Sequence, residues 1–129
     1  MKRTLLAAIS IALCIGLCGC GDSHEHEEAM FELLELNKEL NDVLDTVKDE
    51  SSANAAVSKI EDIGRRKEPI RQRLKKLGKP ASDTQNRVEK KYGDRIAKES
   101  ARLQAHFSRI GPDSDIGKVI GPAMTKTVQ

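Results

Sequence analysis

The chain has 129 residues, of which 33% are charged and only 2% are aromatic. Its length suits one small domain, and three aromatic residues (Phe31, Tyr92 and Phe107) are too few for an aromatic core. Residues 22–62 hold 13 acidic and 3 basic side chains, whereas residues 63–129 hold 7 acidic and 17 basic ones. Such a division suits either an anionic partner for the basic part or pairing of the two parts with each other.

The first twenty residues have the organisation of an export signal. Lys2 and Arg3 give a basic start, residues 5–17 are almost continuously apolar, and the small Gly19 precedes Cys20. A bilayer-spanning helix needs roughly twenty apolar residues, so this run is too short to be retained as one. We therefore expect export and removal of residues 1–19, with ordinary secretion or an uncleaved anchor as the alternatives.

The segment Leu17-Cys18-Gly19-Cys20 resembles the lipobox of bacterial lipoproteins. The resemblance implies cleavage before Cys20 and lipid on its sulfur, while the other two cysteines leave with the leader. Each buried lipid methylene contributes about 0.8 kcal/mol, so several acyl chains hold a protein firmly at a membrane. The implied location is the periplasmic or outer face of a membrane, and Gly21 after the modified cysteine favours the outer membrane. Residues 20–28 are then the lipidated tether and the beginning of a helix.

Apolar residues recur at alternating spacings of three and four over residues 30–47, 53–77 and 88–110. This spacing is typical of amphipathic helices. Sequence signals mark their ends: Ser51-Ser52 and a Ser82/Gln85 capping box at the starts, Gly78 and Gly111 at the stops. Short connections make neighbouring helices antiparallel. The sequence therefore predicts an all-α protein, an up-down-up three-helix antiparallel bundle over residues 29–110 that follows a cleaved signal peptide.

Complementary registers support both expected hairpins. A register that sets Leu40 opposite Ile63 also sets Glu32 opposite Arg71. In the second hairpin, Ile60 falls opposite Leu103. We therefore expect the second helix to pack against both the first and the third.

Pro69 lies inside the expected second helix, five residues after Gly64. An interior proline removes a backbone hydrogen bond, so we expect a kink over 64–69, with two shorter helices as the alternative. Three polar residues occupy seam positions. Asn37 either fixes the register or reaches water at an edge, Lys67 is expected to extend its ammonium group into solvent, and the third is Glu99.

The strongest chemical candidate is the segment containing His24, His26, Glu27 and Glu28. In an extended chain alternate residues point the same way, so the two imidazoles can share a borderline metal with nearby carboxylates. This gives an alternative function, a periplasmic metal-binding or stress-sensing module. The competing interpretation is a solvated acidic first turn, because negative charge suits a helix N-terminus.

A basic run follows in the second expected helix and is a candidate interaction surface for phosphate-bearing polymers or lipid head groups. It comprises Arg65, Arg66, Lys67, Arg71, Arg73, Lys75 and Lys76. No aromatic residues are interleaved with it, which argues against nucleic acid as a partner. The competing interpretation is a solvated face that pairs with carboxylates of the first helix.

Met30 and His106 invite comparison with haem ligands, but parallel first and third helices would place them at opposite ends of the bundle. No nucleophile motif or phosphate-binding loop occurs in the sequence. We therefore expect neither a cofactor nor an enzyme.

Residues 111–129 form a tail punctuated by two Ile-Gly-Pro sequences. Between them, residues 113–120 can form a helical turn that either folds back over the bundle or binds a partner. The sequence as a whole favours a non-enzymatic, lipid-anchored envelope protein that presents helices to an unidentified envelope protein or cell-wall polymer. Self-association through leftover apolar seams is a further expectation.

Overall fold

The computed structural model describes residues 19–128, and side chains from residue 23 onward. Four helices account for most of this part: α1 (Gly19–Asp45), α2 (Glu50–Leu77), α3 (Ser82–Ile110) and α4 (Asp115–Val128). The all-α prediction is confirmed for the described residues. The leader, residues 1–18, and the side chain of Cys20 lie outside them.

The helix ends follow local chemistry. Asp49 caps α2, because its carboxylate accepts a hydrogen bond from the amide of Ser52 while the Ser52 hydroxyl accepts one from the amide of Asp49. Gly78 and Gly111 end α2 and α3 with φ angles of 73° and 60°, in the region that favours glycine. The prediction was wrong at the start of α3, where Ser82 is already helical and Ala81 provides no side-chain cap.

The α1 and α2 helices form the expected antiparallel hairpin, with a slightly different register. Glu32 pairs with Arg73 at 2.8 Å, two residues beyond the predicted Arg71. The α2 helix runs without interruption through Pro69, so the alternative of two shorter helices is wrong. The segment 20–28, expected to be a tether and the beginning of a helix, is helical throughout.

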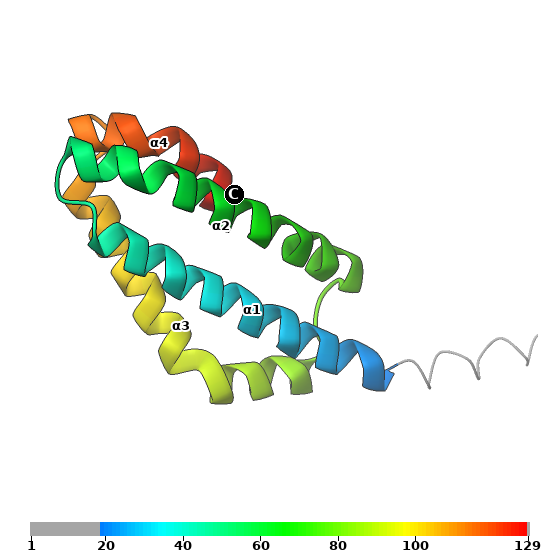
Figure 1. The fold of residues 1–129 in the computed structure, drawn as a ribbon. Coiled ribbons are helices and arrows are strands. Elements are labelled where there is room, and N and C mark those ends of the chain that lie inside the picture. The colour runs from blue at the N-terminus through cyan, green and yellow to red at the C-terminus, as the bar shows by residue number, and fades with distance from the viewer. Residues whose placement is uncertain (1–18, 129) are drawn as a thin grey trace, which may run out of the picture.

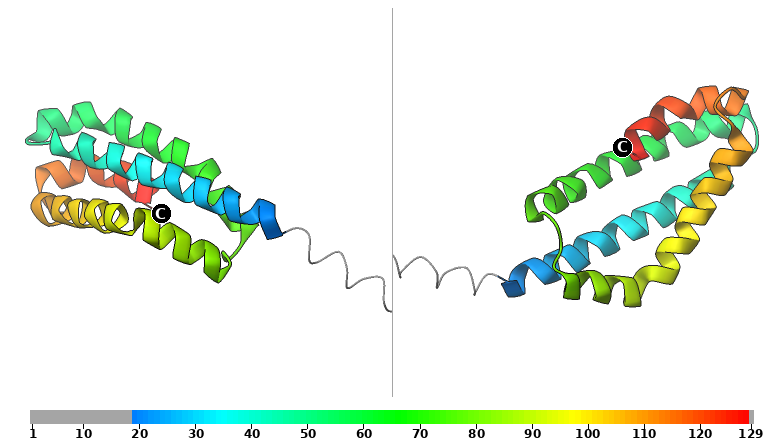
Figure 2. Two further views of the ribbon diagram at one scale, coloured as in Figure 1. Left: turned by 90° about the horizontal axis from the view of Figure 1, so that it is seen from below. Right: turned by 180° about the vertical axis from the view of Figure 1, so that it is seen from behind.

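The α3 helix packs against α1 and not against α2, which corrects the predicted second hairpin. The two helices run parallel, side by side in both views (Figures 1 and 2). The prediction failed because a periodic seam shows which face of a helix is apolar, but not which neighbour covers it. The Ile60–Leu103 pairing is thereby replaced by contacts between α3 and α1.

A fourth helix takes the place that α3 was expected to occupy beside α2. The tail folds back and α4 lies along α2, parallel to it (Figure 1). The amide of Gly117 donates to the hydroxyl of Ser114, which caps the start of α4. Fold-back of the tail is confirmed, although the helix is much longer than one turn. The three-helix description is therefore incomplete for the described chain.

The core lies mainly where the α1–α2 and α3–α4 turns meet. There, Leu40, Leu44, Ile60, Ile120 and Met124 are buried together. Close approach of α4 to α2 depends on Gly64, since an added Cβ would lie 2.7 Å from Oγ1 of Thr127. That hydroxyl in turn donates to the carbonyl of Ile60 at 3.0 Å.

Candidate functional site

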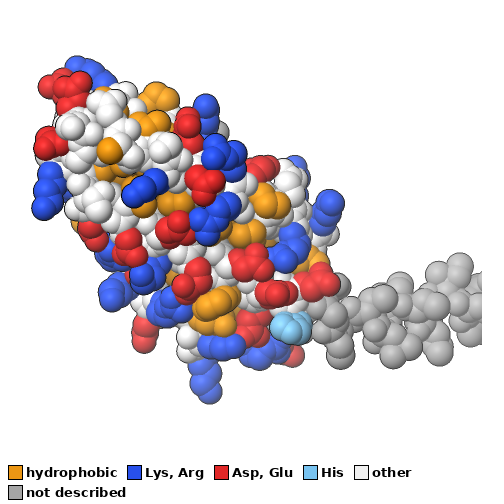
Figure 3. Space-filling model, viewed as in Figure 1, with side chains coloured by type: hydrophobic (Ala, Val, Ile, Leu, Met, Phe, Trp, Pro, Cys, Tyr) orange, Lys and Arg blue, Asp and Glu red, His pale blue; other side chains and the backbone are white. Residues whose placement is uncertain are grey.

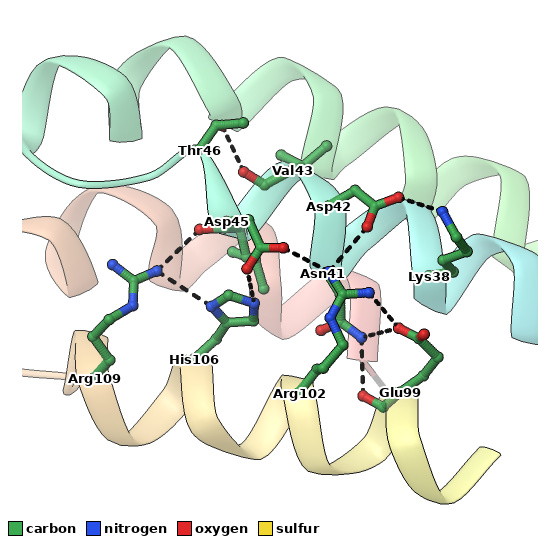
Figure 4. A network of polar contacts seen from close by, with 11 residues as sticks. Lys38, Asn41, Asp42, Val43, Asp45, Thr46, Glu99, Arg102, His106 and Arg109 are labelled. Carbon is green, nitrogen blue, oxygen red and sulfur yellow. Dashed lines mark hydrogen bonds and ion pairs between the residues drawn. The ribbon is translucent and has the colours of Figure 1, made fainter. Parts of the chain in front are cut away.

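The α3 helix is attached to the bundle largely through polar contacts. Of its residues, the buried ones are Thr84, Glu99, His106 and Ile110, so three of these four are polar. Its predicted apolar seam is only partly buried, and Phe107 is 46% exposed. We call the contacts at its C-terminal half the α1–α3 polar interface, formed by Asn41, Asp42, Asp45, Glu99, Arg102, His106 and Arg109 (Figure 4).

Asn41 lies at the centre of this interface and is fully buried. Its side-chain amide donates to Oε2 and to the backbone carbonyl of Glu99, both at 2.9 Å. Arg102 donates to the same Glu99 carboxylate at 2.8 Å, and to Asp42 at 2.9 Å and Asp45 at 2.6 Å. Hydrogen bonds from Lys38 and Arg102 hold the pKa of Asp42 below its ordinary value. The buried Glu99 carboxylate is therefore balanced by a cation and an amide.

The end of α1 is capped by an arginine from α3. Arg109 donates to the carbonyls of Val47 at 2.7 Å and Leu44 at 3.0 Å. These carbonyls lie at the end of α1 and in the turn that follows, where backbone acceptors lack helical donors. Since α1 has no basic residue in its own last turn, α3 supplies the cation that suits a helix C-terminus.

His106 lies between Arg109 and Asp45. Its Nδ1 is 3.2 Å from an Arg109 nitrogen, and its Nε2 is 3.2 Å from Oδ1 of Asp45. Arginine only donates, so Nδ1 accepts and the neutral ring carries its proton on Nε2. Burial lowers the pKa of His106, the charge of Asp45 opposes this, and the charges of Arg109 and Arg102 lower it further. The side chain is buried, with an exposed fraction of 7%.

Sequence reasoning did not find this interface. The signal was present as basic residues at helical spacing (91, 95 and 102), which pair with acidic residues of α1. Lys91 pairs with Glu27 at 2.7 Å, and Arg95 pairs with Glu35. The charge division allowed either an anionic partner or pairing of the two parts with each other. These contacts show that carboxylates of α1 pair with basic side chains of α3.

The histidine segment does not form one cluster. It lies on α1, where a spacing of two residues turns side chains to different sides. His24 is exposed, whereas His26 is buried with Nε2 2.9 Å from the carbonyl of Gly78. Glu27 pairs with Lys91, and Glu28 is exposed. Among the side chains that the structure describes, from residue 23 onward, no three of His, Cys, Asp or Glu lie together as metal ligands.

The basic run on α2 is divided among several environments. Arg65, Lys75 and Lys76 are exposed. Arg66 pairs with Glu39 and Arg73 with Glu32, both at 2.8 Å, and Arg71 donates to the carbonyl of Thr127. Lys67 is buried and cannot belong to an exposed surface, which corrects the expectation that its ammonium group reaches solvent.

An open groove lies between α1 and α2. It has a volume of about 580 Å³ and is lined by Phe31, Glu32, Glu35, Leu36, Arg66, Pro69, Ile70 and Arg73. We call it the α1–α2 groove. Its lining combines apolar residues with charged residues of both signs. Figure 3 shows apolar side chains set among charged ones on the face of the molecule where α1 and α2 lie.

In comparisons with protein-family models, with curated proteins and with solved structures, nothing matches this chain. Among the described helices, none is both long enough and apolar enough to span a bilayer. Met30 lines a pocket with Ile96 near the middle of the parallel α1–α3 pair, while His106 contacts Asp45 near its C-terminal end.

Proposed function

We propose that this protein is exported, loses residues 1–19 and is anchored to a membrane through lipid on Cys20. In this proposal it acts without catalysis, and its three long helices with the added α4 present a surface to an envelope protein or a cell-wall polymer. The observation that carries the proposal is the sequence Leu17-Cys18-Gly19-Cys20 behind a basic and then apolar leader.

The position of Cys20 supports close tethering. The helix α1 begins at Gly19, so the proposed lipid attachment lies in its first turn. His26 and Ala29, the first buried residues described, follow within three turns. A lipid at this position would therefore hold the bundle close to the bilayer, without a long linker between them.

The α1–α2 groove supports binding to a partner. Phe31 is 38% exposed at its edge, and the side chain of Arg66 is 49% exposed although it pairs with Glu39. Aromatic and arginine side chains are enriched among the residues that dominate protein interfaces. We therefore assign the groove as the presented surface.

In-cell crosslinking tests this role. A photo-crosslinking residue at Phe31 is expected to capture a specific partner in the membrane fraction, and the same residue at Lys118 of α4, which is exposed and away from the groove, serves as the matched control. Equal capture of the same species from both positions, or no capture from either, would contradict the assignment of the groove.

A further inference from the structure

We propose that protonation of His106 breaks its contact with Arg109 and loosens the end of α3 from the α1–α2 turn. The α1–α2 turn comprises residues 46–49. The proposed result is that the α3–α4 end of the bundle opens in acid. The chemistry of this device is independent of the proposed export. Its use in the cell rests on that proposed function, because an envelope protein experiences the pH of the surroundings.

The geometry requires a neutral imidazole. Arg109 donates toward Nδ1 of His106, while Nε2 faces the carboxylate of Asp45. Protonation places a hydrogen on Nδ1, so two donors would then face each other at 3.2 Å. The Asp45 contact survives this change and becomes a full ion pair, so the contact that is lost is the one to Arg109.

Loss of this contact has a structural consequence because Arg109 also holds the turn. The same guanidinium nitrogen that faces His106 donates to the carbonyl of Leu44, and its neighbour donates to Val47. Repulsion from a charged His106 acts directly on this cap. The described charged groups near the ring are Asp45 on α1 and Arg102 and Arg109 on α3, so two cations oppose one anion.

The ring of His106 also borders an apolar pocket. This pocket has a volume of about 230 Å³ and lies between α1, α3 and α4. The α4 residues that line it, among them Ile120 and Met124, are uncharged, so α4 offers a protonated ring no compensating carboxylate. The α2 helix does not contribute to this pocket. An apolar pocket disfavours a charged imidazole.

The test is an NMR titration of the purified full chain in detergent, which follows the three imidazoles and the amides of residues 44–48. We expect His106 to titrate below the ordinary value of a histidine, and the amides of the turn to shift with the midpoint of His106. In His106→Gln this shift should be lost, whereas His24→Gln should retain it. A midpoint of His106 that is not below the ordinary value of a histidine, or turn amides that do not respond, would overturn the proposal.

A second pair of variants separates this device from a purely structural role. Arg109→Met removes the opposing donor, so the midpoint of His106 should rise. Asp45→Asn removes the favourable charge, so the midpoint should fall. Unchanged midpoints in both variants would also overturn the proposal. The measurements do not depend on lipid or location, so a failure of the proposed function would leave them interpretable.

Discussion

The ammonium group of Lys67 donates a hydrogen bond to Oδ1 of Asn37 across the α1–α2 interface, at 2.7 Å. Lys67 is only 3% exposed, and no described carboxylate forms an ion pair with it. Burial lowers the pKa of Lys67 to about 8, and the charge of Arg71 contributes. A buried cation with a neutral partner therefore joins the two helices, at a cost in stability.

Replacement of this lysine should stabilise the protein at neutral pH. Lys67→Met keeps the aliphatic volume and removes the desolvated charge, so we expect a gain of about 1–3 kcal/mol in the free energy of unfolding at pH 7. Urea denaturation measures it, and Lys76→Met at an exposed position is the control. A destabilised Lys67→Met protein would show that the bond to Asn37 outweighs the cost of burial.

The pH dependence of stability provides an independent check on Lys67. Its pKa of about 8 in the folded state lies below the ordinary value of 10.5, so the unfolded chain binds more protons between these two values. Stability should therefore rise with pH across the window from about 8 to 10.5. The difference in the free energy of unfolding between the wild type and Lys67→Met should rise over the same window. If this difference does not change with pH, the pKa of Lys67 is not lowered.

The contact between α4 and α2 should depend on Gly64. A Cβ at this position would approach Oγ1 of Thr127 to 2.7 Å, and that hydroxyl is already held by the carbonyls of Ile60 and Ala123. We expect Gly64→Ala to destabilise the protein by about 1–2 kcal/mol, because the strain exceeds the gain in helix propensity. Thermal denaturation followed by circular dichroism measures the effect.

Gly93 in α3 is the matched control for this substitution. A Cβ there meets only the side chain of Glu89 at 3.7 Å, an ordinary contact. Gly93→Ala should therefore stabilise the helix by up to about 1 kcal/mol. Similar effects of the two substitutions would mean that α4 does not depend on close approach at Gly64.

Arg102 should be the most important single side chain of the α1–α3 polar interface. Arg102→Met removes its bonds to Asp42, Asp45 and Glu99 and leaves the buried Glu99 with only the Asn41 amide. We expect a loss of about 2–3 kcal/mol, measured by urea denaturation. Lys38→Met removes an exposed pair with Asp42 and should change stability by about 0.5 kcal/mol or less. Equal effects would contradict a special role for Arg102.

The sequence was a good guide to where helices occur and a poor guide to how they pack. The stops at Gly78 and Gly111 were predictable because glycine at a helix end has a specific conformational role. The helix that packs against α3 was not predictable, since the partly apolar seam of α3 fits either α1 or α2. Apolar periodicity placed Glu99 in the seam of α3 but passed over His106, and it could not show the partners of either residue on α1.

The position of α4 illustrates a second limit. Its sequence includes Gly121 and Pro122, which resemble the punctuation of a loop, yet both lie within the helix. Packing against α2 decides the outcome, because Ile120, Ala123, Met124 and Thr127 are all buried. Local signals could not show that α4 continues through Gly121 and Pro122, because the surface of α2 on which it packs is formed by residues distant in sequence, such as Gly64.

The most direct test of the proposed lipid anchor is metabolic labelling with a radioactive or clickable fatty acid, in cells that produce the wild type or Cys20→Ser. The wild type should incorporate label and fractionate with membranes, and the variant should do neither. A wild type that takes up no label, or a variant that is labelled to the same extent, would contradict the account.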